Sequence, residues 1–465
     1  MSASIDLDSN ARKKPRLNGR DIISNLPPTI IRHILSLLPA KDVLRTSVLS
    51  KAWEYKWTCI YNIHIDEKTW FSRKKGRTKT KTKTKSVVNF VDRILLFSRA
   101  TIKSFHLSCS YKYSPTQIIT WISAVVMRNV EDLQIDYDHK GVILPRCLFN
   151  CTSLSRLKLG LPCTFRVPVE NWSSNVLKIL HLDKVEILND SCVSDTLVLD
   201  FPVLETIELC NCKWLKVKFV EIKAPALTKF NVVHHSLPKG VKCQIRIFGA
   251  KLLKFDLYGH FVESIDLSMS SVFSAVVDCR STADDFVVIR KDGLFARSLL
   301  KECFGISRLR LSGDVVEGFA RSKRGTALPK FNMLKRLELV RKCKIGALLE
   351  MLHVMPYLES TTFYMLQWHD YDYEEVKSVP TCITNHLNEV QFHQFSGKPP
   401  HIHLADFLLT NAVRLKKMLG LFRKKHGERK IEKNFWEKLK RVYGGGNFEL
   451  GSSVQNMTDF ELLFG

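Results

Sequence analysis

Short apolar strands recur along most of this chain at a nearly constant spacing, and this repeat constrains the fold more than any other feature. Segments such as LSRLKLG, LETIELC and LKRLELV share the form L-x-x-L-x-L. Their equivalent positions are Leu133, Leu157, Leu180, Ile207, Phe230, Phe255, Leu309 and Leu337. The intervals are 24, 23, 27, 23, 25, 54 and 28 residues, so one further repeat near Val277 brings the period close to 25. Such a unit cannot bury its apolar side chains alone, and we expect neighbouring units to stack into a continuous core.

A period close to 25 lies in the range of leucine-rich repeats and predicts a curved α/β solenoid. Prolines before several strands, as in FPVLET and MPYLES, end any preceding helix. The usual asparagine ladder is mostly missing, and residues 280–305 read as an irregular insert that ends in a helix, so the curvature and the exact repeat count stay open. The concave side of a solenoid suits large ligands, which favours a protein target.

The sequence before the repeats, residues 21–57, predicts three short helices. Proline at Pro27 and Pro28 opens the first helix, predicted over 28–38, because proline is tolerated only in the first turn. The second is predicted over 41–49, and the third follows Ser50 as its N-cap. The first helix has two neighbouring apolar stripes, one formed by Ile30, Ile34 and Leu38 and the other by Ile31 and Leu35.

Three short helices cannot bury this much apolar surface among themselves. A docking module for a partner's helices and an ordinary N-terminal cap on the repeats both fit this pattern. We expect the later residues Trp53, Trp57 and Leu49 to pack inside the helical unit.

The string LP-x₆-IL-x₃-P-x₂-D-x₂-R-TSVLSK-x-W resembles the F-box motif of plant proteins over about 45 residues. The matching positions are Leu26, Pro27, Ile34, Leu35, Leu38, Pro39, Asp42, Arg45, Thr46, Ser47, Val48, Leu49, Ser50, Lys51, Trp53 and Trp57. The resemblance implies docking to a Skp-type adaptor that in turn binds a cullin scaffold. The implied adaptor-binding residues are Leu26, Pro27, Ile30, Ile34, Leu35, Leu38, Pro39, Val43, Leu44 and Ser47.

Residues 382–419 read as a strand, a Gly/Pro loop and a helix. The strand carries Leu387, Val390 and Phe392, and one helix face carries Leu404, Phe407, Leu408, Leu415, Met418 and Leu419. This segment resembles the FBD module found with plant F-box and leucine-rich segments. Its role is not implied by the resemblance, and capping of the final repeat is our physical expectation.

The formal net charge of +25 is concentrated in two segments rather than spread over the chain. Residues 73–85 contain eight Lys/Arg and no acid, and residues 414–441 contain twelve basic and three acidic residues. A nucleic-acid reader needs basic side chains across a folded face, so a solvated loop and a solvated helix are favoured. The cluster Arg12, Lys13, Lys14 and Arg16 is a candidate nuclear import signal.

Other chemistry has little support in the sequence. The chain has no apolar run of about 18 residues and no secretory signal, so we expect a soluble intracellular protein without membrane contact. The 13 scattered cysteines favour free thiols over disulfides. The pairs His401/His403, His234/His235 and Cys210/Cys212 lack a second pair at a zinc-site interval. No phosphate-binding glycine motif follows a strand. We therefore expect no metal, cofactor or catalytic residue.

The resemblance implies a non-catalytic substrate-recognition subunit of a cullin-type ubiquitin ligase, which we expect in the nucleus, the cytoplasm or both. The alternative is a nucleic-acid-associated repeat protein that uses its basic tracts. The predicted fold is α/β, with a three-helix F-box, a leucine-rich-repeat solenoid and a strand-plus-helix FBD module. The predicted segments are 1–20 basic disordered N-terminus, 21–66 F-box, 67–86 Lys/Thr-rich linker or loop, 87–375 repeats, 376–442 FBD module with C-terminal helix, and 443–465 tail.

Overall fold

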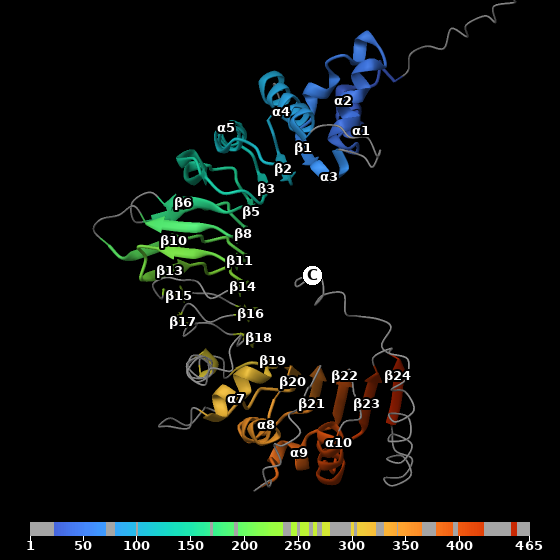
Figure 1. Cartoon of the computed structure of the whole chain (residues 1–465), viewed down its shortest axis with the longest axis vertical. Coiled ribbons are helices and arrows are strands. Elements are labelled where there is room, and N and C mark those ends of the chain that lie inside the picture. The colour runs from blue at the N-terminus through green and yellow to red at the C-terminus, as the bar shows by residue number, and fades with distance from the viewer. Residues whose placement is uncertain are drawn as a thin grey trace, which may run out of the picture.

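The chain folds into an open arc that begins with small helices and continues as one long sheet (Figure 1). The computed structural model describes residues 23–70, 80–98, 101–167, 171–189, 194–235, 243–248, 252–259, 264–266, 272–279, 299–301, 305–321, 330–341, 343–364, 378–393, 399–422 and 448–452. None of the helices in these ranges is both long enough and apolar enough to cross a membrane.

Short helical pieces form the N-terminal unit. They are α1 (Pro28–Ser36), α2 (Ala40–Arg45), and the 3₁₀ turns η1 (Thr46–Val48), η2 (Lys51–Trp53) and η3 (Lys56–Cys59). Proline precedes or opens both α-helices, where its missing N–H costs no helical bond. The predicted third helix is instead two separate 3₁₀ turns, and the Ser50 hydroxyl makes no capping hydrogen bond.

A sheet of 15 parallel strands lines the concave side of the arc (Figure 1). In spatial order its strands are β1 (Asn62–Asp66), β2 (Ser104–Cys109), β3 (Asp132–Tyr137), β5 (Arg156–Gly160), β8 (Ile179–Asp183), β11 (Thr206–Cys210), β14 (Lys229–His234), β16 (Lys254–Gly259), β18 (Ser274–Cys279), β19 (Arg308–Ser312), β20 (Arg336–Val340), β21 (Ser360–Tyr364), β22 (Glu389–His393), β23 (Lys417–Phe422) and β24 (Phe448–Ser452). The sheet therefore starts directly after the N-terminal helices and continues to the last described strand.

The strand register is the one that the repeat spacing predicts. Each predicted equivalent position from Leu133 to Phe255 pairs with the next one across the sheet. The predicted hidden repeat is β18, where Ala275 pairs with Phe255 on one side and Leu309 on the other. The long interval of 54 residues thus divides into 20 and 34.

The outer side of the arc changes from helices to strands and back (Figure 1). Its helices are α4 (Thr80–Phe97), α5 (Pro115–Val126), η4 (Arg146–Asn150), α7 (Gly313–Arg321), α8 (Ile345–Leu352), α9 (Thr381–Asn385) and α10 (Pro399–Asn411), while α3 (Glu67–Trp70) lies near α1 at the N-terminal end. One short parallel sheet contains β4 (Val142–Ile143), β6 (Cys163–Val167), β9 (Glu186–Asn189) and β12 (Lys213–Leu215). The other contains β7 (Asn171–Ser173), β10 (Thr196–Asp200), β13 (Phe219–Lys223), β15 (Gln244–Phe248) and β17 (Ser264–Asp266).

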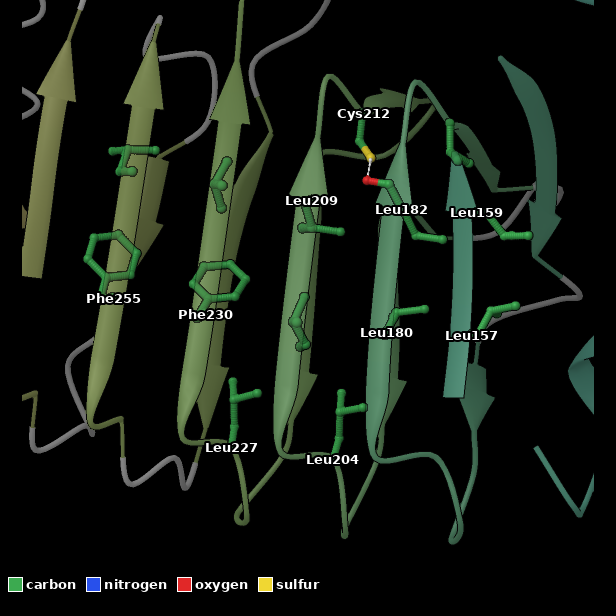
Figure 2. Packing of buried hydrophobic residues seen from close by; sticks show 14 of the residues in the cluster. Leu157, Leu159, Leu180, Leu182, Leu204, Leu209, Cys212, Leu227, Phe230 and Phe255 are labelled. Atoms are coloured by element: carbon green, nitrogen blue, oxygen red, sulfur yellow. Dashed lines mark hydrogen bonds between the residues drawn. The ribbon is translucent and has the colours of Figure 1, made fainter. Parts of the chain in front are cut away.

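Apolar side chains from consecutive strands lie at the same height and form one continuous core (Figure 2). Phe230 and Phe255 stack with ring centroids 5.9 Å apart. A second apolar row lies in the turns that precede the strands, at Leu204 and Leu227 among others, and is also fully buried. Burial of one such side chain contributes about 1.5–3 kcal/mol, so the stacked rows give each repeat its main stabilisation.

Two sequence predictions need correction. The predicted C-terminal helix ends at Asn411, and Leu415, Met418 and Leu419 lie in or just before β23. The segment predicted as a Lys/Thr linker or loop is helical from Thr80 onward, where α4 begins. The basic segment from 423 to 441 and the predicted tail, apart from β24, lie outside the described residues.

Candidate functional site

Helix α1 has two apolar stripes that face different surroundings. Ile31 and Leu35 point into the chain and are 2% and 1% exposed. Ile30 and Leu37 are 45% and 72% exposed, and they lie seven residues apart on the other stripe. The helix is therefore apolar on a face that the described part of this chain leaves open.

The turn η1 carries two further exposed apolar residues of the same helical unit. Val48 is 83% exposed and Leu49 is 66% exposed. The expectation that Leu49 packs inside the unit is therefore wrong. Trp53 and Trp57 are buried as expected, and their indole N–H groups donate to Ser24 Oγ and the Glu54 carbonyl, both at 2.9 Å. We call Ile30, Leu37, Leu38, Val48 and Leu49 the open apolar face.

The predicted adaptor-binding residues divide into three groups. Ile30, Leu38, Pro27 and Pro39 are exposed, whereas Leu26, Ile34, Leu44 and Ser47 are half-buried. Leu35 and Val43 are each 1% exposed, so the structure places them beneath the face rather than on it. The Ser47 hydroxyl donates to the Leu44 carbonyl at 2.7 Å. The candidate import residues Arg12, Lys13, Lys14 and Arg16 lie outside the described residues.

Sequence reasoning missed Leu37 and Val48 as members of this face. Leu37 follows Ile30 by seven residues and Ile34 by three. This helical spacing already predicts that Leu37 lies on the same face as these two residues. For Val48 the chain offers no such signal, because a 3₁₀ turn has a different period.

A buried carboxylate in α3 helps to join the helical unit to the first repeat, since the Trp70 carbonyl of α3 accepts a hydrogen bond from Lys41 of α2. Glu67 in α3 is 2% exposed. One of its oxygens accepts from the backbone N–H of Ser110 at 2.5 Å and of Tyr111 at 2.8 Å, and the other accepts from the Tyr113 hydroxyl. Burial and the contact with Glu67 raise the pKa of the Tyr113 hydroxyl well above its usual value. Three donors of the segment after β2 thus converge on one side chain.

The concave face carries rows of polar side chains across neighbouring strands. Glu208 accepts from Lys229 at 2.5 Å and contacts His181 Nδ1 at 2.7 Å. These contacts lower the pKa of Glu208 from 4.5 to about 2, with the His181 hydrogen bond the largest cause. Farther along, Arg310 Nη2 lies 2.6 Å from Glu338 Oε2. Positively and negatively charged side chains both occur on the concave face. Such a face suits binding to a large polar surface of another molecule.

The sequence pairs considered for metal binding form no larger cluster where the structure describes their side chains. Among the described residues, no group of three or more His, Cys, Asp or Glu side chains is placed to hold a metal ion. The thiol of Cys212 donates to the Leu182 carbonyl inside the core (Figure 2). The ten cysteines that the structure describes with their side chains are free thiols.

Two segments of the chain match models of known domain families. Residues 23–60 match the F-box domain family, and residues 374–419 match the FBD family. The open apolar face lies within the first match, and β21 is followed by the second.

Whole-chain relatives combine the same modules. The chain is 29% identical over 426 residues to an F-box/FBD/LRR-repeat protein of Arabidopsis thaliana, covering 86% of this chain and 88% of the relative. It is 28% identical over 424 residues to an FBD-associated F-box protein of the same plant, covering 85% and 89%. A shorter match, 31% over 213 residues, joins 45% of this chain to 55% of an F-box/LRR-repeat protein. With the F-box, the parallel-strand repeats and the FBD module in this order, the chain is similar over most of its length to F-box/FBD/LRR-repeat proteins of Arabidopsis thaliana.

Proposed function

We propose that this protein is the substrate-recognition subunit of a cullin-type ubiquitin ligase. The open apolar face carries the proposal, because exposed Ile30, Leu37, Val48 and Leu49 lie in a matched F-box domain. Clustered apolar side chains of this size mark a surface for a partner rather than for water. The partner is a Skp-type adaptor, which connects the protein to the cullin scaffold.

The concave sheet holds the target, which is a protein. The sheet extends over 15 strands and presents charged, polar and aromatic side chains, including Lys158, His181 and Arg310. This arrangement supports binding of an extended or folded polypeptide better than binding of a small molecule in a closed pocket.

The protein acts by proximity and performs no chemistry itself. It holds the target on the repeats while the F-box attaches the machinery that transfers ubiquitin, so the target lysine meets it at a high effective concentration. The hydrogen bonds around Glu67 support this mechanism, because a stiff joint restricts where the target is presented. We further propose that the protein acts in the nucleus or the cytoplasm, with the Arg12 to Arg16 cluster as the import signal.

The direct test measures binding of full-length protein to a recombinant plant Skp-type adaptor. Leu37→Glu and Val48→Glu place charges on the open apolar face and should weaken binding by 100-fold or more. Met333→Glu is the matched control, since Met333 is 62% exposed and lies before β20 in the repeats. Undiminished binding by both F-box variants would refute the proposed adaptor docking.

A further inference from the structure

Exposed apolar side chains also occur outside the F-box match, at the ends of the first two long helices. Leu96 and Phe97 end α4 and are 76% and 54% exposed. Met127 follows the last residue of α5 and is 79% exposed.

One guanidinium holds the two helix ends together. Arg128 donates to the Leu95 carbonyl of α4 and to the Ala124 carbonyl of α5, the latter at 3.1 Å. A cation at these carbonyls also complements the helix dipoles. Leu96, Phe97 and Met127 thus adjoin in sequence the residues that this guanidinium joins, and we call these three exposed residues the helix-end patch.

The helix-end patch contacts the F-box. The Phe97 ring meets the Trp57 ring edge to face, with centroids 6.4 Å apart. The Arg93 guanidinium lies over the Trp57 ring, 5.8 Å from the ring centroid. Tyr55, which is 63% exposed, is close enough to Arg93 for the two to interact electrostatically.

The topology of the repeats explains why these ends lie in a row. The turn η3 precedes β1, α4 precedes β2 and α5 precedes β3, and these strands are parallel neighbours. The ends of η3, α4 and α5 must therefore follow one edge of the sheet in the same order. The turns η1 and η2, which carry or adjoin Val48, Leu49 and Tyr55, pack against η3 and each other. An apolar band thus extends from the open apolar face through Tyr55 to Met127.

We infer that the adaptor contacts this whole band, so that its footprint continues beyond the F-box onto the first repeat. This inference rests on the proposed adaptor docking. Continuity with the open apolar face selects the adaptor rather than another partner. The cations Arg93 and Arg128 lie along the band, and the nearby Asp92 is occupied by the N–H groups of Gln117 and Trp121. The covering surface of the adaptor should therefore combine apolar and acidic side chains.

The consequence is an adaptor held by two rigidly connected elements. An adaptor that touches the F-box alone could pivot around it, whereas contact with α4 and α5 fixes its direction relative to the target surface. The first repeat then contributes to affinity and to the geometry of ubiquitin transfer.

The test uses full-length protein and the recombinant adaptor. Leu96→Glu with Met127→Glu should lower the affinity at least about tenfold, because two apolar contacts become buried charges. Both side chains are exposed, so the melting temperature should stay unchanged. The control Val413→Glu, at an 84% exposed residue before β23, should leave the affinity unchanged. A photo-crosslinker at position 127 should capture the adaptor, whereas one at position 413 should not.

The outcomes separate this inference from the proposed function. If Val48→Glu abolishes binding while the Leu96/Met127 double variant binds normally, the footprint ends at the F-box and only the extension is refuted. If neither set of variants weakens binding, the adaptor docking itself is refuted. If the wild type self-associates, the double variant is monomeric and its adaptor affinity is unchanged, the patch is a contact between copies and the extension is again overturned.

Discussion

The F-box and the repeats use the same apolar residue types in opposite ways. In the repeats, Leu133, Leu157 and Phe230 are completely buried, each beside the equivalent residue of an adjacent strand. In the F-box, Leu37 and Val48 are 72% and 83% exposed. Apolar side chains are thus buried within the chain in the repeats and remain exposed in the F-box.

This contrast shows that composition does not reveal where burial takes place. A strand in a stacked repeat has neighbours on both sides, so its inward residues are covered as soon as the register is set. A short helix at the end of a solenoid has one neighbouring surface and can cover only one stripe. An uncovered stripe marks the place where another protein completes the core.

The largest expected effect comes from removing a side chain of the buried ladder. Phe230→Ala should lower the free energy of unfolding by about 3–5 kcal/mol, because it leaves a cavity between two stacked strands. Chemical denaturation measures the change. The matched change Leu253→Ala, at a 60% exposed residue just before β16, should cost no more than about 0.5 kcal/mol. Equal costs at the two sites would contradict the stacked core.

A smaller loss is expected at the joint between the two regions. Glu67→Ala leaves the backbone N–H groups of Ser110 and Tyr111 and the Tyr113 hydroxyl without their acceptor. We expect a loss of about 3 kcal/mol, since an unsatisfied buried donor costs about 1–3 kcal/mol. Hydrogen exchange should accelerate at residues 110–113. The control Glu54→Ala, at an exposed residue, should change neither the free energy of unfolding nor the exchange rates. Unaltered exchange in the Glu67 variant would show that other contacts hold the joint.

Acid should weaken the repeats more than the F-box. The pKa of Glu208 is lowered from 4.5 to about 2, so its contribution to stability is complete above pH 4.5 and is lost as the pH falls toward 2. We expect this contribution to be about 1–2 kcal/mol after screening by water. In the described part of the F-box, the Asp42 and Arg45 side chains form an ion pair that is largely exposed. Glu208→Gln should flatten the dependence of unfolding free energy on pH between 4.5 and 2, and an unchanged slope would rule out Glu208 as its source.

The repeat register could be predicted from the sequence because it depends on spacing alone. The same repeat spacing also applies to the segment near Met418, which was predicted as a helix. Leu415 lies three residues before Met418, as Leu227 lies three before Phe230, and both pairs end at a ladder position. The helical reading prevailed because LLTNAVRLKKML also fits a period of 3.6.

The site was less predictable than the fold for a physical reason. Two apolar stripes on α1 indicated an excess of apolar surface, and the motif indicated the kind of partner. The choice between the Ile31/Leu35 stripe and the Ile30/Leu37 stripe depends on which side of α1 packs against η3 and the rest of the chain, and that is decided by tertiary packing. The bonds of Glu67 were equally invisible, because their partners lie more than 40 residues away.

The smallest expected stability change is the one that sharpens the comparison most. Leu37→Ser removes an apolar side chain from a surface that water already reaches, so the free energy of unfolding should change by no more than about 0.5 kcal/mol. Its neighbour Leu35→Ser, which is 1% exposed on the same helix, should cost several-fold more because it buries a hydroxyl and opens a cavity. Both variants should bind the adaptor less tightly, the first by loss of contact and the second by loss of structure. Thermal denaturation in the absence of adaptor separates the two causes. A large stability loss from Leu37→Ser would mean that this chain covers the stripe itself, which would leave no open face for a second protein.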